Sequence, residues 1–118
     1  IIKKISSYDI TIRELKKIYN ISELKDLGDQ LLSEISSGIG VVGAKGEKTP
    51  NIVIVVSDDL IQKEISAVEL SRAIGEEMGT GGGGRPHLAI TGARDNNQLR
   101  ALLNQANTHI LHVLKTLK

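Results

Sequence analysis

The segment "NIVIVV" at residues 51–56 places five β-branched residues in succession, with no polar residue among them. β-Branched side chains favour strands, and a strand without polar alternation belongs in the middle of a sheet. A second β-branched segment, "GIGVVGA", precedes it at 38–44, and the connecting "KGEKTP" contains the turn residues Gly46 and Pro50. The sequence therefore predicts two neighbouring strands, of which 51–56 is central.

Apolar residues at helical spacing predict three main helices around these strands. The first begins near Ser22 and is expected to end at Gly38, because glycine readily takes the left-handed conformation of a helix carboxyl end. Capping-box pairs mark the starts of the other two, Ser66 with Glu69 and Asp95 with Gln98. The last helix has the longest apolar stripe, which consists of Leu99, Leu102, Leu103, Ala106, Ile110, Val113 and Leu117.

Two further segments are predicted as strands. "YDITIREL" at 8–15 alternates apolar with polar residues, although Thr11 and Glu14 also fit a capping box for a short helix over 12–19. We favour the strand there, and "PHLAIT" at 86–91 gives another. The resulting order is β-α-β-β-α-β-α, an α/β (α+β) fold with a mixed sheet of about four to five strands and three main helices.

Length and composition bound the remaining possibilities. The 118 residues are expected to form a single domain, 1–118, and the apolar runs are too short for a membrane span. The chain has no cysteine, which excludes disulfides and thiolate metal sites. Because it starts with "IIKK" and not with methionine, we expect a fragment of a longer chain.

Charge is unevenly distributed along the sequence. Residues 18–78 hold five basic and eleven acidic side chains, a net charge of −6. Residues 79–118 hold five basic side chains and one acidic side chain, a net charge of +4, together with all three histidines. Such asymmetry indicates either a phosphate-bearing partner or a solvated basic face.

The glycine run "GTGGGGRPH" at 79–87 opens this basic part. It is not a dinucleotide fingerprint, because a helix precedes it, and not a Walker A loop, because Arg85 and Pro86 stand where Lys and Ser or Thr are required. Residues without Cβ can turn several N–H groups toward one anion, and the guanidinium of Arg85 suits phosphate oxygens. The alternatives are a flexible connector, or close packing between a helix and a strand.

Other candidates for chemistry are weaker. His109 and His112 stand one helical turn apart, but no cysteine or nearby carboxylate completes a metal site, so we expect none. Asp58 and Asp59 could hold magnesium, but such a pair more often ends a strand at a turn. No catalytic set is predicted.

Several segments resemble the C-terminal domain of alanyl-tRNA synthetases, also called the DHH-associated domain. They occur in the same order: "SELKDLGDQLL", "NIVIVVSDDL", "GGGGRPHLA" and "TGARDNNQLRALLNQ". In the synthetases the glycines and Arg-Pro usually continue as Asp-Met-Ala-Gln, whereas this chain has His87, Leu88, Ala89 and Ile90, so the role of the Asp position does not carry over. Related DHH-type phosphoesterases have histidine directly after the glycines, and here Arg85 and Pro86 intervene.

The resemblance implies a C-terminal accessory domain that contacts alanine-accepting tRNA and supports dimerisation in the cytoplasm. Aminoacylation and editing would lie elsewhere in the parent ligase, as would any ATP or zinc, so no cofactor is expected here. With two tyrosines and no Phe or Trp, contacts by shape and phosphate are expected in place of stacking on aromatic rings. The alternatives are the substrate-binding domain of a DHH-type phosphoesterase and an oligomerisation module without RNA contact. The expected RNA or phosphate contacts are Gly81, Gly82, Gly83, Gly84, Arg85, His87, Arg94 and Arg100.

Two further leucines, Leu111 and Leu114, widen the apolar stripe of the last helix. Leu111 projects about 100° away from Ile110 and cannot easily face the same core. Either the first residues of the chain (Ile1, Ile2 and Ile5) cover these leucines, or a second copy does. We favour a homodimer in which Leu111 and Leu114 lie at the interface.

Overall fold

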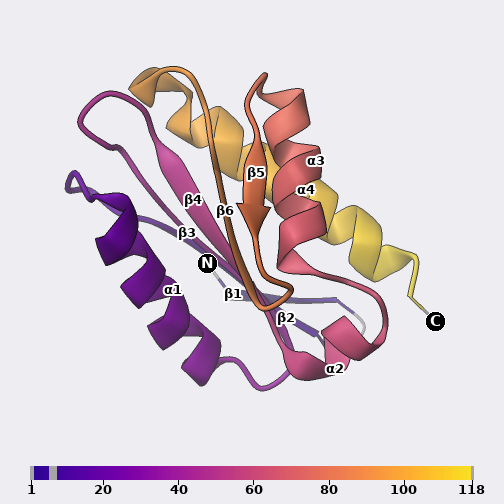
Figure 1. Cartoon of the computed structure of the whole chain (residues 1–118). Helices are drawn as coiled ribbons and strands as arrows, with labels where there is room; N and C mark the ends of the chain where they lie inside the picture. Colours follow the sequence, from indigo (N-terminus) through magenta and orange to yellow (C-terminus); the bar gives the residue numbers. More distant parts are fainter. Residues whose placement is uncertain (1, 6–7, 118) are drawn as a thin grey trace.

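The computed structural model describes residues 2–5 and 8–117, with side chains from residue 8 onward. One mixed sheet has the strand order β1-β2-β3-β4-β6-β5 (Figure 1). The strands are β1 (Ile2–Ile5), β2 (Tyr8–Glu14), β3 (Gly38–Ala44), β4 (Asn51–Val56), β5 (Gly82–Gly84) and β6 (Leu88–Gly92). The helices are α1 (Ile21–Glu34), α2 (Asp58–Gln62), α3 (Ala67–Glu77) and α4 (Leu99–Lys115), with a short 3-10 turn at Asn96–Gln98.

The sheet confirms the predicted fold class and the central place of residues 51–56. β4 lies between β3 and β6 and pairs antiparallel with both. β2 and β3 pair in parallel because α1 carries the chain back across the sheet between them. Residues 8–14 of the predicted segment form a strand and not a helix, as predicted.

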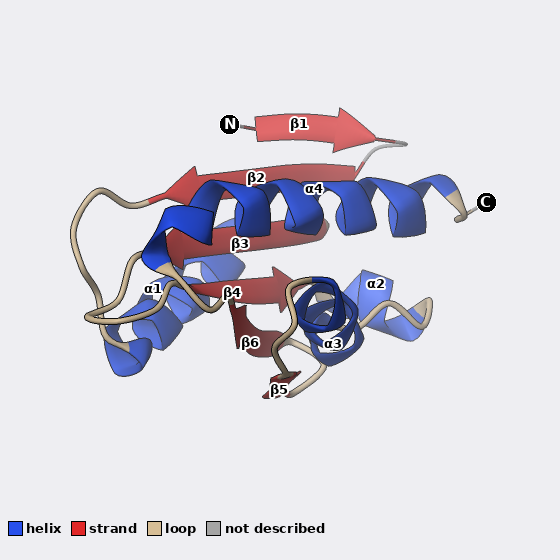
Figure 2. Ribbon diagram, turned by 90° about the horizontal axis from the view of Figure 1, so that it is seen from above, coloured by secondary structure: helices blue, strands red, loops and turns tan. Residues whose placement is uncertain are grey.

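Helices cover both faces of the sheet (Figure 2). One core lies between the sheet and helices α3 and α4, and the smaller core lies under α1. Along β4 the side chains alternate between these cores: Ile54 enters the first, and Val53 and Val55 enter the second. All three are fully buried, which explains why this strand has no polar face.

The helix starts follow the capping patterns. The Ser66 hydroxyl accepts a hydrogen bond from the Glu69 N–H. Asp95 with Gln98 forms a complete capping box, but at the start of the 3-10 turn that leads into α4 and not at α4 itself. An unpredicted box, Asn20 with Glu23, starts α1.

The prediction that Gly38 ends the first helix is wrong. α1 stops at Glu34, and Gly38 begins β3, where an added Cβ would collide with the backbone of Asp9. This glycine allows two adjacent strands to approach, so it has no role in the turn of the helix.

The structure of α4 shows that part of the predicted dimer interface is wrong. Leu114 is fully buried in the core beneath α4. Leu111, which was not expected to face that core, packs against it and is partly buried. Leu114 follows Ile110 by four residues, so both lie on the same face of the helix. Leu114 therefore cannot contact a second copy. Ile1 lies outside the described residues, and the structure describes only the backbone of Ile2 and Ile5, in β1.

Candidate nucleic-acid interface

The glycine run forms the edge strand β5 and packs closely against α3. A Cβ on Gly82 would collide with the Ser71 carbonyl of α3, and a Cβ on Gly75 would lie 2.7 Å from the Thr91 hydroxyl oxygen. Gly84 has φ +144°, a conformation that residues with side chains rarely adopt. Close packing between helix and strand therefore explains part of the run.

Gly81 and Gly83 have a different environment. No atom lies within 4 Å of the position that a Cβ would occupy on either residue. Because side chains alternate along a strand, Gly83 faces away from α3 and toward the side of the sheet that α1 covers. Packing within the chain does not require glycine at these two positions.

Arg85 stands in a turn that is anchored on three sides. Its N–H donates to the Leu88 carbonyl (2.8 Å), the Pro86 carbonyl accepts from the Ala67 N–H (2.8 Å), and the His87 carbonyl accepts from the Val56 N–H (3.0 Å). The Arg85 side chain itself is exposed. Within the part of the chain that the structure describes, its guanidinium has no hydrogen bond or ion pair. A fixed backbone therefore presents a free cation.

His87, from the same turn, is tied to the start of α2. Its Nε2 lies 2.6 Å from Oδ1 of Asp58, and the side chains are 51% and 84% exposed, respectively. This contact restrains the turn and places a carboxylate against the histidine ring.

Asp59, the neighbour of Asp58, belongs to a hydrogen-bond network with two serines. Its carboxylate accepts hydrogen bonds from the Ser37 hydroxyl and from the Ser57 hydroxyl (2.5 Å), and the Ser57 oxygen accepts from the Gly38 N–H (2.9 Å). Burial raises the pKa of Asp59, but the bonds from Ser37, Ser57 and nearby backbone N–H groups outweigh it and hold the pKa below its ordinary value.

Arg94 is engaged at the far end of the β5–β6 hairpin. Its Nε and Nη2 atoms both donate to the Gly79 carbonyl, at 3.1 and 2.9 Å. Gly79 has φ +72° and follows the carboxyl end of α3, so the guanidinium caps that helix.

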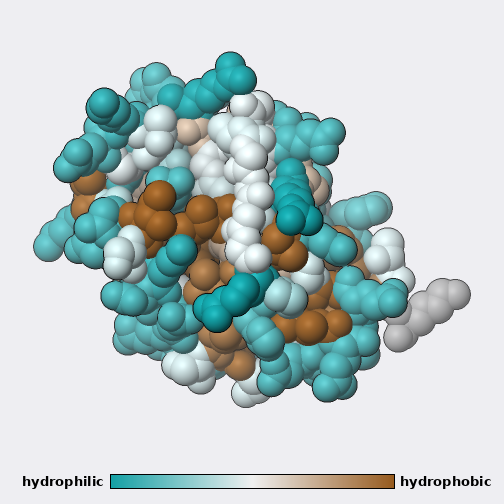
Figure 3. Space-filling model, in the orientation of Figure 1, coloured by the Kyte–Doolittle hydropathy of each residue, from teal (hydrophilic) through white to brown (hydrophobic). Residues whose placement is uncertain are grey.

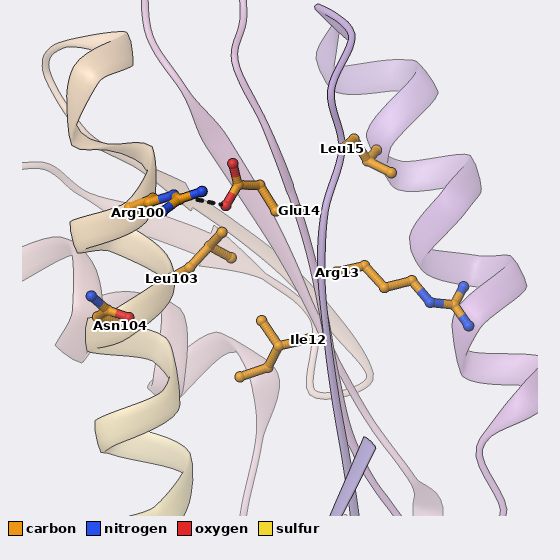
Figure 4. Close-up of a pocket in the computed structure, with 7 residues that line it drawn as sticks. All are labelled: Ile12, Arg13, Glu14, Leu15, Arg100, Leu103 and Asn104. Atoms are coloured by element: carbon orange, nitrogen blue, oxygen red, sulfur yellow. Dashed lines mark ion pairs between the residues drawn. The ribbon is translucent and has the colours of Figure 1, made fainter. Parts of the chain in front are cut away.

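Arg100 lies elsewhere, on α4. Its Nε is 3.5 Å from Oε1 of Glu14 on β2, across a shallow groove floored by Ile12 and Leu103 (Figure 4). Arg13 extends to the opposite side of β2 and pairs with Glu34 of α1 at 3.0 Å. The predicted contacts Arg94 and Arg100 thus do not converge with Arg85.

A second groove, of ≈ 560 Å³, lies beside the face of β5 on which Gly83 has open space. It runs between the start of α1 and the β5–β6 hairpin, and its lining residues are Ile21, Lys25, Gly83, Gly84, Arg85, Leu88, Ala89 and Ile90. Figure 3 shows this region as a pale glycine strip with hydrophobic surface between it and α1. We name it the glycine groove. Sequence reasoning missed Ile21 and Lys25, because nothing in the sequence links them to glycines some sixty positions later.

The described residues contain no group of three or more His, Asp or Glu side chains that could hold a metal ion. His109 is half-buried and His112 exposed on α4. No helix in the described ranges is both long and apolar enough to cross a membrane.

Comparisons with known proteins agree with this architecture. An alanine–tRNA ligase of Pelotomaculum thermopropionicum is 32% identical over 81% of this chain, and one of Nostoc sp. is 33% identical over 91%. The chain spans only 11% and 12% of these two relatives.

The fold also matches a solved structure. The C-Ala domain of Aquifex aeolicus alanyl-tRNA synthetase superposes with a TM-score of 0.77, covering 93% of this chain and 97% of that domain at 21% identity. Residues 7–111 match the DHHA1 domain family. The resemblance to the C-terminal domain of alanyl-tRNA synthetases is thus confirmed, and the chain belongs to the DHHA1 domain family.

Proposed function

We propose that this chain is the tRNA-binding accessory domain of an alanine–tRNA ligase. The observation that carries the proposal is Arg85, a cation without a partner in the described part of the chain, held by an anchored turn beside the open glycine face. Guanidinium groups bind phosphate oxygens through two parallel hydrogen bonds, and an exposed backbone lets a ligand approach closely. The ligase relatives supply the class of RNA, which is alanine-accepting tRNA.

The proposed role is binding and not catalysis. Aminoacylation and editing would be carried out by other parts of a longer ligase, and ATP or zinc would bind there. In that role the domain holds tRNA for those centres in the cytoplasm.

Self-association is a second proposed property, and it rests on Leu111 alone. The Leu111 side chain packs against the core but stays partly exposed on α4, whereas Leu114 is fully enclosed. A second copy would cover the apolar surface that Leu111 leaves exposed.

The binding of tRNA is tested with an Arg85→Ala variant. Loss of a charge-assisted phosphate contact should weaken binding of alanine-accepting tRNA by about 1–3 kcal/mol. The slope of log K against log[salt] should become shallower by about 0.7–0.9, as expected for one phosphate contact. Both quantities are measured by fluorescence polarisation of labelled tRNA over a salt series.

Lys115→Ala is the charge-matched control, because it removes one positive charge at the end of α4, away from the groove. It should leave affinity and slope nearly unchanged. If Arg85→Ala and Lys115→Ala lose the same affinity for tRNA, the effect comes from net charge and not from a contact of Arg85. If the unmodified chain does not bind tRNA at low salt, the proposal is wrong.

A further inference from the structure

The glycine groove has a floor that phosphate binding alone does not require. Besides Lys25, Arg85 and two glycines, it is lined by apolar side chains, among them Ile21 and Ile90. Ile21 is 47% exposed, one of two large hydrophobic residues with exposed side chains in the described chain. A phosphate gains nothing from an apolar surface, so part of the groove fits a different part of a ligand.

Gly83 leaves this floor flat. No atom lies within 4 Å of its absent Cβ, and its φ is not in the left-handed region. Nothing in the fold therefore prevents a side chain at this position. A glycine in a strand that no neighbour requires marks a place where a ligand can approach the backbone closely.

Charge selects the kind of ligand. Lys25 of α1 and Arg85 of the β5–β6 turn both line the groove, and none of its described lining residues is acidic. Neither cation has an ion pair within the described residues. An apolar floor with two free cations complements a flat, weakly polar ring that is joined to phosphates.

We propose that the glycine groove binds an unpaired nucleobase of RNA. The base lies on Gly83 between Ile21 and Ile90, while Lys25 and Arg85 contact the flanking phosphates. This inference rests on the proposed RNA-binding function and extends it from phosphate contact to base contact. In this groove aliphatic side chains take the place of the aromatic rings on which bases usually stack, since the flat face of any base can pack on apolar surface.

The test fills the groove without removing a charge. Gly83→Val places a side chain over the floor, and a β-branched residue is well accepted in a strand. Ala101→Val is the matched control, because it also enlarges a small residue to valine, at an exposed position of α4 that does not line the groove. The probes are alanine-accepting tRNA and a single-stranded RNA 12-mer carrying 2-aminopurine.

Gly83→Val should weaken binding of both probes about tenfold, an effect of the size expected for losing a small buried apolar contact. It should also abolish the change in 2-aminopurine fluorescence on binding, while the salt slope stays that of the unmodified chain. Ala101→Val should behave like the unmodified chain. Ile21→Ser should reduce affinity in the same direction as Gly83→Val, again without altering the slope.

The outcomes separate the two proposals. If Arg85→Ala loses affinity and has a shallower salt slope but Gly83→Val binds as Ala101→Val does, base contact is wrong and phosphate contact stands. If neither probe binds the unmodified chain at low salt, both proposals fail. A circular-dichroism spectrum and unfolding midpoint like those of the unmodified chain show that each variant is folded.

Discussion

At the scale of single residues, the four consecutive glycines of 81–84 differ in what they do. Gly82 is required by packing, since its Cβ would meet the Ser71 carbonyl, whereas Gly81 faces open space. Gly82→Ala should therefore destabilise the fold by about 1–3 kcal/mol, the usual cost of overpacking, and Gly81→Ala should be nearly neutral. Urea unfolding of both variants measures the difference. Equal stabilities would show that α3 and β5 separate easily.

Asp59 should make the free energy of unfolding decrease as the pH falls into the acid range. Its folded pKa lies below the ordinary value of about 3.9, so the carboxylate stabilises the fold above that pH, and the contribution is lost as pH falls through the folded pKa. Asp59→Asn should lower the free energy of unfolding by about 1–2 kcal/mol at pH 7. The difference from the unmodified chain should shrink toward pH 3.

Urea unfolding at several pH values between 7 and 2.5 checks this expectation. Asp26→Asn, at an exposed position on α1, is the control and should show no such trend. A deficit of Asp59→Asn that stays constant over the whole range would contradict the hydrogen-bonded carboxylate.

At the scale of elements, Arg94 joins the loop after β6 to the end of α3. The Nε and Nη2 atoms of Arg94 both donate to the Gly79 carbonyl, so Arg94→Ala should destabilise the chain by about 1 kcal/mol. The salt slope of tRNA binding should remain that of the unmodified chain, because this guanidinium is already occupied. Arg72→Ala, at an exposed position on α3, is the control for stability. If the salt slope of tRNA binding is shallower in Arg94→Ala, Arg94 does contact the RNA.

At the scale of the whole molecule, self-association depends on the surface left open on α4. We expect sedimentation equilibrium to show a monomer–dimer equilibrium at micromolar concentration, which Leu111→Asp abolishes because a buried unpaired carboxylate is costly. His112→Asp adds the same charge at an exposed position and should leave the dimer intact. A monomer mass for the unmodified chain at all concentrations would rule out the dimer.

The sequence by itself determined the elements whose cause is local. Residues 51–56 form a central strand because five β-branched residues leave no polar face. α3 begins directly after Ser66 because the Ser66 hydroxyl accepts a hydrogen bond from the Glu69 N–H in the first turn. In these cases the residues that decide the structure lie within a few positions of each other, so periodicity and capping patterns detect them.

Only the tertiary structure decided the environment of residues whose neighbours are distant in sequence. Gly38 was expected to end a helix but permits the approach of β2, and Leu114 was expected at a surface but lies in the core. Ile21 and Lys25 line a groove with Gly83 only because α1 packs on the face of the sheet toward which Gly83 is directed. A pattern along the chain records which side chains share a face, but not which segment packs against it, because that depends on the strand order and the crossover.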